Sequence, residues 1–171
     1  MEEYQIDENF LNIICEIRGK VLQGCIDLEM TMDTYIAQHF CETESKVYEM
    51  ATIILAPRIP WREKLAIFEV LIEKYNQPFK INFPNFLNDI TNVIEHRNVF
   101  AHLPADITPN GYKLFKEQGI VPFLKFKNYK LPITKEISYV RSPSYTNEEI
   151  NNILAGVHTY KVEIRYMLKS I

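Results

Sequence analysis

The chain has 171 residues, of which 47% are hydrophobic and 24% are charged, and its formal net charge is −3 at pH 7. These values predict one globular domain with a sizeable core, and they argue against nucleic-acid binding driven by overall charge, although a local basic face remains compatible with them. The sequence contains no apolar run of about 18 residues, so it excludes a membrane-spanning helix.

Four helices are predicted in the first hundred residues from apolar positions that recur every three or four residues. The first covers roughly residues 8–40, and the second covers residues 44–55, ending at the two prolines of APRIPW. The third covers residues 61–75. The stretch NQPFKINFPN is then expected to be a loop, and the fourth helix runs from near Pro84 to near His102.

The pattern then changes to short alternating runs, which predict a hairpin with strands at residues 121–127 and 133–139, inserted at about residues 119–141. Thr146 and Glu149 form a capping box that opens a last helix ending near Lys169. The expected fold is therefore mainly α. It is an antiparallel bundle of about five helices with a β-hairpin before the last helix, in a single domain over residues 1–171.

The segment EHRNVFAHLP, residues 95–104, breaks the apolar pattern of the fourth helix. On a helical wheel with Phe86 at zero, Arg97 falls at about 20°, near the centre of the apolar stripe. Asn98 and His102 fall at about 120° and 160°, four residues apart on one face. A guanidinium group at a core-facing position needs an acidic partner or a function.

The first helix offers that acidic partner, because Glu29 lies within its own apolar stripe. One interpretation is therefore a buried pair of Glu29 and Arg97 that fixes helix register, with Glu29 as a structural counter-ion. Arg18 lies on the same stripe and would compete for Glu29. This interpretation does not explain His102 at the end of the helix.

The stretch RNVFAH resembles the R-x4-6-H motif of HEPN domains, which are small helical proteins. Asn98 matches the polar residue that typically follows the arginine. The motif also ends a helix that follows a long first helix and two shorter ones. The segments IRGKVLQGCIDLE and WREKLAIFEVLIEKY are similar to the family's first and third helices. The resemblance covers about residues 8–103 and the last helix.

The resemblance implies two alternative functions. Many HEPN domains are metal-independent endoribonucleases of defence and toxin–antitoxin systems, and others are inactive modules for RNA binding or dimerisation. The family commonly forms homodimers that bring two motifs to one cleft, and a toxin would have an antitoxin protein as partner. The implied catalytic residues are Arg97 on the scissile phosphate, His102 as acid or base, and Asn98 orienting His102 or binding the phosphate.

Between residues 113 and 141, seven basic residues stand against two acidic ones, and aromatic residues are interleaved with them. This composition suits a single-stranded RNA surface, where Lys125, Lys127 and Lys130 would pair with phosphates. The alternative is an ordinary hairpin with one packed and one solvated face, since Lys125 and Lys127 share a face opposite Leu124 and Phe126.

No metal or other cofactor is predicted, because His39 and His96 lack a metal-like spacing with cysteine or carboxylate residues. Cys15, Cys25 and Cys41 form no C-x-x-C pair and suit small core residues in a reducing compartment. The N-terminus, MEEYQIDENF, lacks the features of a signal peptide, so we expect a cytoplasmic protein.

Three hypotheses follow. An RNA-cleaving HEPN protein predicts that Arg97 and His102 converge in a cleft open to solvent. A catalytically silent HEPN module permits that cleft but predicts no turnover. A helical dimer without a site predicts Arg97 sealed against Glu29, with His102 remote.

Overall fold

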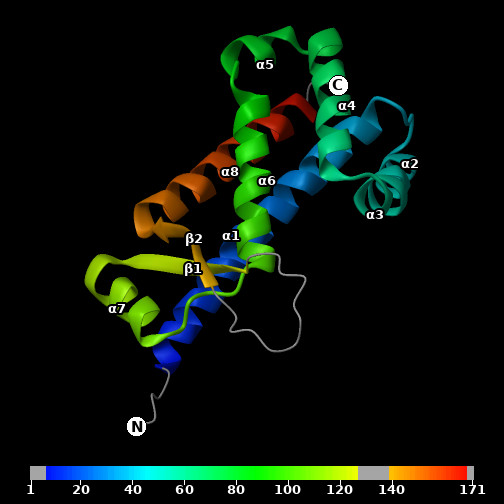
Figure 1. Ribbon diagram of the computed structural model, residues 1–171. Helices are drawn as coiled ribbons and strands as arrows, with labels where there is room; N and C mark the ends of the chain where they lie inside the picture. The colour runs from blue at the N-terminus through cyan, green and yellow to red at the C-terminus, as the bar shows by residue number, and fades with distance from the viewer. Residues whose placement is uncertain (1–6, 127–138, 169–171) are drawn as a thin grey trace. The chain divides into compact units, whose positions relative to one another are not determined.

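The computed structural model describes residues 7–126 and 139–168, and for residues 125–126 and 139–142 it describes the backbone alone (Figure 1). It confirms a mainly α fold with a two-stranded antiparallel hairpin before the last helix.

The chain forms two compact units. The first unit holds residues 7–22, 96–126 and 139–154, and the second holds residues 23–95 and 155–168. The helices α1 (Glu8–Gln38), α6 (Phe86–His102) and α8 (Asn147–Leu168) contribute residues to both units. The prediction of one domain over residues 1–171 stays a prediction.

In the first unit, the start of α1 packs against helix α7 (Pro109–Gln118). Asp7 caps α1, because its Oδ1 accepts hydrogen bonds from the backbone N–H groups of Asn9 and Phe10 at 2.9 and 3.4 Å. The buried ring of Phe10 lies 5.4 Å from the ring of Tyr112 and 4.8 Å from that of Phe115. The Tyr112 hydroxyl also donates to Asp7 Oδ2 at 2.7 Å, so one aspartate caps one helix and holds the other.

Residues 109–118 form helix α7, an element that the sequence pattern did not predict. Thr108 caps its start, because the hydroxyl accepts a hydrogen bond from Gly111 N–H at 3.3 Å, and Gly119, in the left-handed region (φ 63°), caps its end. Gly111 is required at its position, since a Cβ atom there would lie 1.9 Å from the Asp106 carbonyl oxygen.

The hairpin consists of β1 (Ile120–Phe126) and β2 (Tyr139–Thr146), with a bulge between Pro122 and Phe123. The first strand lies where the sequence predicted it. The second strand was expected at residues 133–139, but the partner of β1 is residues 139–146, and residues 133–138 lie outside the described residues. The alternating lysine and aromatic residues indicate strands but do not determine which residues pair, because the register also depends on the partner strand.

The predicted capping box is confirmed. Thr146 N–H donates to Glu149 Oε2 at 2.7 Å, and Glu149 N–H donates to Thr146 Oγ1 at 3.2 Å, so α8 follows directly on β2.

In the second unit, residues 44–58 form one continuous helical run rather than a helix that ends at residue 55. It comprises α2 (Glu44–Glu49), the π-helical turn η1 (Met50–Leu55) and α3 (Ala56–Arg58). In a regular α-helix the ring of Pro57 would meet the carbonyl of Ile53, and the wider π-turn just before it lessens that clash. The helical run therefore passes the first proline of APRIPW.

Helix α4 (Trp61–Tyr75) matches its predicted bounds, but the expected loop after it contains the short helix α5 (Gln77–Asn82). Asn76 Oδ1 accepts from Phe79 N–H at 3.2 Å and caps α5. A helix of six residues is not stable alone, so it depends on packing. The buried ring of Phe79 supplies that packing, lying 6.3 Å from the ring of Phe68 and 5.1 Å from that of Phe86.

Aromatic side chains also join α6 to α8 within the second unit. The ring of Tyr160 lies 5.0 Å from that of Phe86 in an edge-on arrangement, and its hydroxyl donates to Asp89 Oδ2. Burial and the neighbouring Asp89 carboxylate raise the pKa of Tyr160 to about 12, so this hydroxyl keeps its proton over the working range of pH.

Candidate functional site

The last two turns of α6 carry the predicted motif, and all three of its residues belong to the first unit. Arg97 is half-buried, whereas Asn98 and His102 are exposed. Arg97 Nη1 donates a hydrogen bond to Asn98 Oδ1 at 3.2 Å. The amide next to the arginine therefore holds the guanidinium at the surface, where a ligand from solvent can reach it.

His102 stands in the final turn of α6 and makes no hydrogen bond within the described part of the chain. No described residue occupies either ring nitrogen, and each can bond to a substrate or to a second protein chain. The structure brings Arg97 and Asn98 into contact, and it gives neither of them a hydrogen bond to His102.

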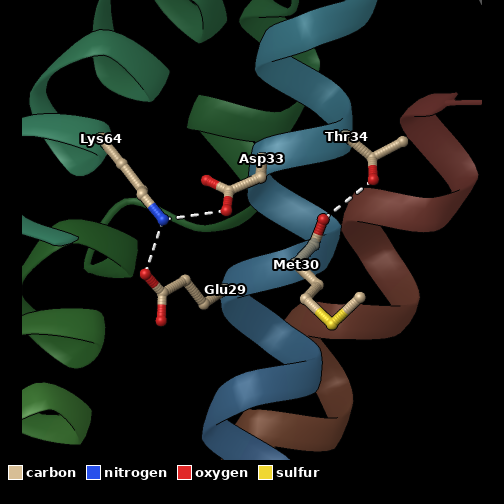
Figure 2. Close-up of polar contacts among 5 residues, drawn as sticks. All are labelled: Glu29, Met30, Asp33, Thr34 and Lys64. Carbon is tan, nitrogen blue, oxygen red and sulfur yellow. Dashed lines mark hydrogen bonds and ion pairs between the residues drawn. The ribbon is translucent and has the colours of Figure 1, made fainter. Parts of the chain in front are cut away.

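Over residues 7–126 and 139–168, Arg97 forms no ion pair with a carboxylate. The expected partner, Glu29, is paired with Lys64 instead, with Nζ and Oε1 2.6 Å apart (Figure 2). Lys64 Nζ also lies 2.8 Å from Asp33 Oδ2. The predicted pair of Glu29 with Arg97 is therefore corrected to Glu29 with Lys64.

The physical reason is the burial of Lys64, whose side chain is 0% exposed. A fully buried ammonium group requires anionic partners, and two carboxylates one turn apart on α1 provide them. Lys64 lies on the buried side of α4 between apolar neighbours, and its residue type gave no indication in the sequence that it would be internal.

Arg18 also differs from its expected role as a competitor for Glu29. Its Nη2 donates to the carbonyl oxygen of Leu103, the residue after His102, and its guanidinium lies 5.6 Å from the centre of the Phe123 ring. A cation at this position stabilises the C-terminal end of α6, where carbonyl groups lack intrahelical partners. Sequence reasoning placed Arg18 on the correct face of α1 but could not give its partner.

The chain that leaves α6 is fixed to β1 by backbone hydrogen bonds. Leu124 N–H donates to Pro104 O at 2.9 Å, and Asp106 N–H donates to Pro122 O at 2.8 Å. The ring of Phe123 in turn lies 5.0 Å from that of Phe100 on α6. The hairpin therefore supports the end of α6 that carries His102, a role the sequence did not indicate.

His96, one step before Arg97, is engaged in packing. Its Nδ1 lies 3.0 Å from the Tyr145 hydroxyl, and the two rings meet edge-on at 5.4 Å. Among the described residues there is no group of three or more His, Cys, Asp or Glu side chains that could hold a metal ion.

The hairpin lysines proposed to bind RNA cannot be placed. Lys125 lies in β1 by its backbone, but its side chain is outside the description, and Lys127 and Lys130 lie outside the described residues altogether.

Comparisons of the chain with protein-family models, with curated proteins and with solved structures give no match. None of the helices in residues 7–126 and 139–168 combines the length and the apolar character of a membrane span.

Proposed function

We propose that this chain is a HEPN-like protein that binds RNA at Arg97, Asn98 and His102 and cleaves it without a metal ion. The observation that carries the proposal is the state of Arg97. It is a half-buried arginine with no carboxylate partner among the described residues, held by Asn98 on the helix that ends at the exposed His102. The hypothesis of a sealed Glu29–Arg97 pair loses its support, because Glu29 is bonded to Lys64.

The proposed chemistry is attack of an RNA 2′-hydroxyl on the adjacent phosphate. Arg97 would hold the phosphate oxygens, since a guanidinium group presents several donors in one plane and keeps its charge. His102 would remove the 2′-hydroxyl proton or protonate the leaving 5′-oxygen. The products would be a 2′,3′-cyclic phosphate and a 5′-hydroxyl.

One histidine per chain supplies one half of an acid–base pair. The proposal therefore includes a homodimer in which His102 of a second copy supplies the other half. As the resemblance to HEPN proteins implies, the proposed setting is a cytoplasmic defence or toxin–antitoxin system with an antitoxin protein as partner.

A second function is favoured by one observation, namely that His102 makes no hydrogen bond to Arg97 or Asn98 in the described structure. An arginine and an amide without a coupled histidine suffice to bind a phosphate but not to cleave it. In this alternative the chain is a catalytically silent RNA-binding or dimerisation module.

The test uses purified protein and a 5′-labelled single-stranded RNA in the presence of EDTA. We expect the wild type to produce cyclic-phosphate ends, and His102→Ala to lose cleavage by about 100-fold or more, as expected for loss of an acid–base group. His158→Ala is the matched control, because His158 is exposed on α8 outside the motif.

Arg97→Ala should reduce both RNA affinity and cleavage, with Arg165→Ala on α8 as its control. Binding that depends on Arg97 without any cleavage would select the silent module. RNA left unbound and uncut by the wild type would refute RNA cleavage and RNA binding alike.

A further inference from the structure

The helical run over residues 44–58 is apolar in sequence, but little of it is buried in the structure. It contains the stretch VYEMATIILAP, yet its only buried residues are Ala51 and Leu55. Its exposed large apolar side chains are Tyr48, Ile53 and Ile54. Among the described residues, every exposed large apolar side chain except Ile107 belongs to the second unit, which holds this run. The run therefore leaves apolar surface that the described part of the chain does not cover, as is typical of an interaction site.

This run forms one wall of a groove of about 690 Å³ in the second unit, and the C-terminal half of α1 forms the other. The lining positions recur with helical spacing on both walls. They are residues 30, 34 and 38 on α1, and residues 44, 47–48 and 51–52 on the run. At a rise of about 1.5 Å per residue, each wall is about 12 Å long. That length matches about two turns of a third helix laid between them.

Two apolar side chains on opposite walls of the groove are open to solvent. Met30 is 53% exposed and Tyr48 is 70% exposed. In Figure 2, Met30 lies on the side of α1 opposite Lys64, so it stands apart from the buried ion cluster. A methionine side chain is flexible and polarisable, and it adapts to the apolar side chains of a partner. The groove thus offers apolar contact on both walls.

The charged side chains of the groove select the kind of partner. Glu42 and Glu44 are exposed lining residues, and none of the described lysine, arginine or histidine residues lines the groove. A second copy related by a two-fold axis would bring the same carboxylates toward one another, which costs free energy. An anionic membrane surface would also be repelled. A helix that carries lysine or arginine beside its apolar face is attracted instead.

We propose that this groove binds a basic amphipathic helix of another protein. The apolar side chains of that helix contact Met30 and Tyr48, and its lysine or arginine side chains lie near Glu42 and Glu44. One apolar face in a groove between two helices is a common mode of peptide recognition. The groove belongs to the second unit, whereas the proposed RNA motif belongs to the first, so this inference does not rest on the proposed function.

The test measures binding of a fluorescent leucine–lysine peptide to the full chain by fluorescence anisotropy. The peptide has about 14 residues, or four helical turns, with leucine at positions i, i+3, i+4 and i+7. One comparison peptide has glutamate in place of lysine, and another has the same residues in an order without an apolar face. At physiological ionic strength, we expect saturable one-to-one binding of the leucine–lysine peptide, at least about tenfold tighter than that of either comparison.

Variants identify the groove as the binding site. Met30→Lys and Tyr48→Lys each place a cation in an apolar wall and should weaken binding of the leucine–lysine peptide about tenfold. Val70→Lys is the matched control, because Val70 is 61% exposed on α4, does not line the groove, and the change adds the same charge. It should alter the affinity by less than about twofold. Thermal unfolding of the three variants verifies that each is folded.

Equal weakening by Met30→Lys and Val70→Lys would overturn the proposal, since binding would then reflect only the overall acidity of the chain. A wild type that does not bind the leucine–lysine peptide, or that binds the leucine–glutamate peptide equally well, would overturn it too. None of these results depends on whether the chain binds or cleaves RNA.

Other occupants of the groove give distinct results, and each of them would replace the proposed partner. A wild-type dimer that Met30→Lys dissociates and Val70→Lys keeps, in analytical ultracentrifugation, would assign the groove to a second copy of the chain. Binding to neutral phosphatidylcholine vesicles with the same dependence would assign it to a lipid surface. Peptide binding strengthened about tenfold by Ile171→Lys would assign it to residues 169–171 of the chain itself.

Discussion

Arg18 on α1 donates a hydrogen bond from Nη2 to the backbone carbonyl of Leu103, 85 positions later in the chain and one residue after His102. The same guanidinium lies over the ring of Phe123 in β1. One side chain thus links the first helix, the end of the motif helix and the hairpin, all within the first unit. Arg18 is a positioning residue for the end of α6 rather than a group that touches substrate.

Replacing Arg18 with Met should keep most of the apolar contact and remove both the hydrogen bond and the cation–π contact. We expect a loss of about 1–3 kcal/mol in the free energy of unfolding, measured by urea denaturation. Lys20→Met is the control, because Lys20 is exposed on the same helix and pairs only with Glu16, and it should change stability by less than about 0.5 kcal/mol. Equal losses in the two variants would show that the contact with Leu103 contributes nothing.

Two glycines of the first unit should respond in opposite directions to alanine. A Cβ atom at Gly111 would lie 1.9 Å from a backbone oxygen of Asp106. At Gly19, no described atom beyond the chain neighbours and the adjacent backbone of α1 lies within 4 Å of a Cβ atom. Gly111→Ala must shift backbone and should cost about 2 kcal/mol or more. Gly19→Ala lies within α1 and should stabilise the chain by about 0.5–1 kcal/mol.

Thermal unfolding followed by circular dichroism measures both changes. A Gly111→Ala protein that unfolds at the wild-type temperature would contradict the close approach of α7 to Asp106.

The long helices were predictable because each carries its own periodic apolar stripe. The bounds of α4 were predicted exactly as observed, and α1 differs only at its end. The capping box of Thr146 and Glu149 was also readable, since its two side chains and two N–H groups lie within four residues. Elements that depend on interactions between residues close in the chain can therefore be recognised from the sequence.

The elements that the sequence missed depend on distant partners. Helix α5 is stable only with Phe79 packed in the aromatic core, and the second strand is defined by its pairing with β1. Helix α7 is a partial exception, because Thr108 and Pro109 at its start and Gly119 at its end are local signals of a helix start and a helix end.

The candidate site likewise has one feature that the local sequence pattern predicts and another that depends on distant residues. The sequence predicted that Arg97 interrupts an apolar stripe, but it did not predict that no carboxylate of residues 7–126 or 139–168 would pair with it. Glu29 was available to any buried cation, and only the packing of α4 shows that Lys64 takes it. A helical wheel shows which face of its helix a residue lies on, but it does not show which residue of another helix packs against that face.

Replacing Lys64 with Met should destabilise the second unit strongly, although the apolar stem is kept. Glu29 and Asp33 would face each other without a cation, and loss of one member of a buried ion cluster costs about 3–5 kcal/mol. Arg62→Met, an exposed position on the same helix, is the control. Adding Glu29→Gln and Asp33→Asn to Lys64→Met should restore part of the loss. A single variant as stable as the control would refute the structural role of the cluster.

Asp33 makes stability depend on pH in a predictable direction. Burial raises the pKa of its carboxyl group from 3.8 to about 6, and the hydrogen bond from Lys64 only partly offsets this effect, while the nearby Glu29 carboxylate adds to it. The folded chain therefore binds the Asp33 proton more tightly than the unfolded chain does. The stabilisation of the folded chain by binding of this proton is fully present below pH about 4 and is lost as the pH rises through about 6.

The measurement is the difference in unfolding free energy between the wild type and Asp33→Asn from pH 4 to pH 7. This difference isolates the carboxyl group of Asp33, because the asparagine amide that replaces it does not titrate. The wild type should lose up to roughly 3 kcal/mol relative to the variant across this interval. Glu16→Gln is the comparison, since hydrogen bonding to Lys20 lowers the pKa of Glu16 and reverses the sign. A wild type that instead gains stability over Asp33→Asn as pH rises would mean that Lys64 holds Asp33 ionised, and that attraction to the lysine outweighs the loss of hydration.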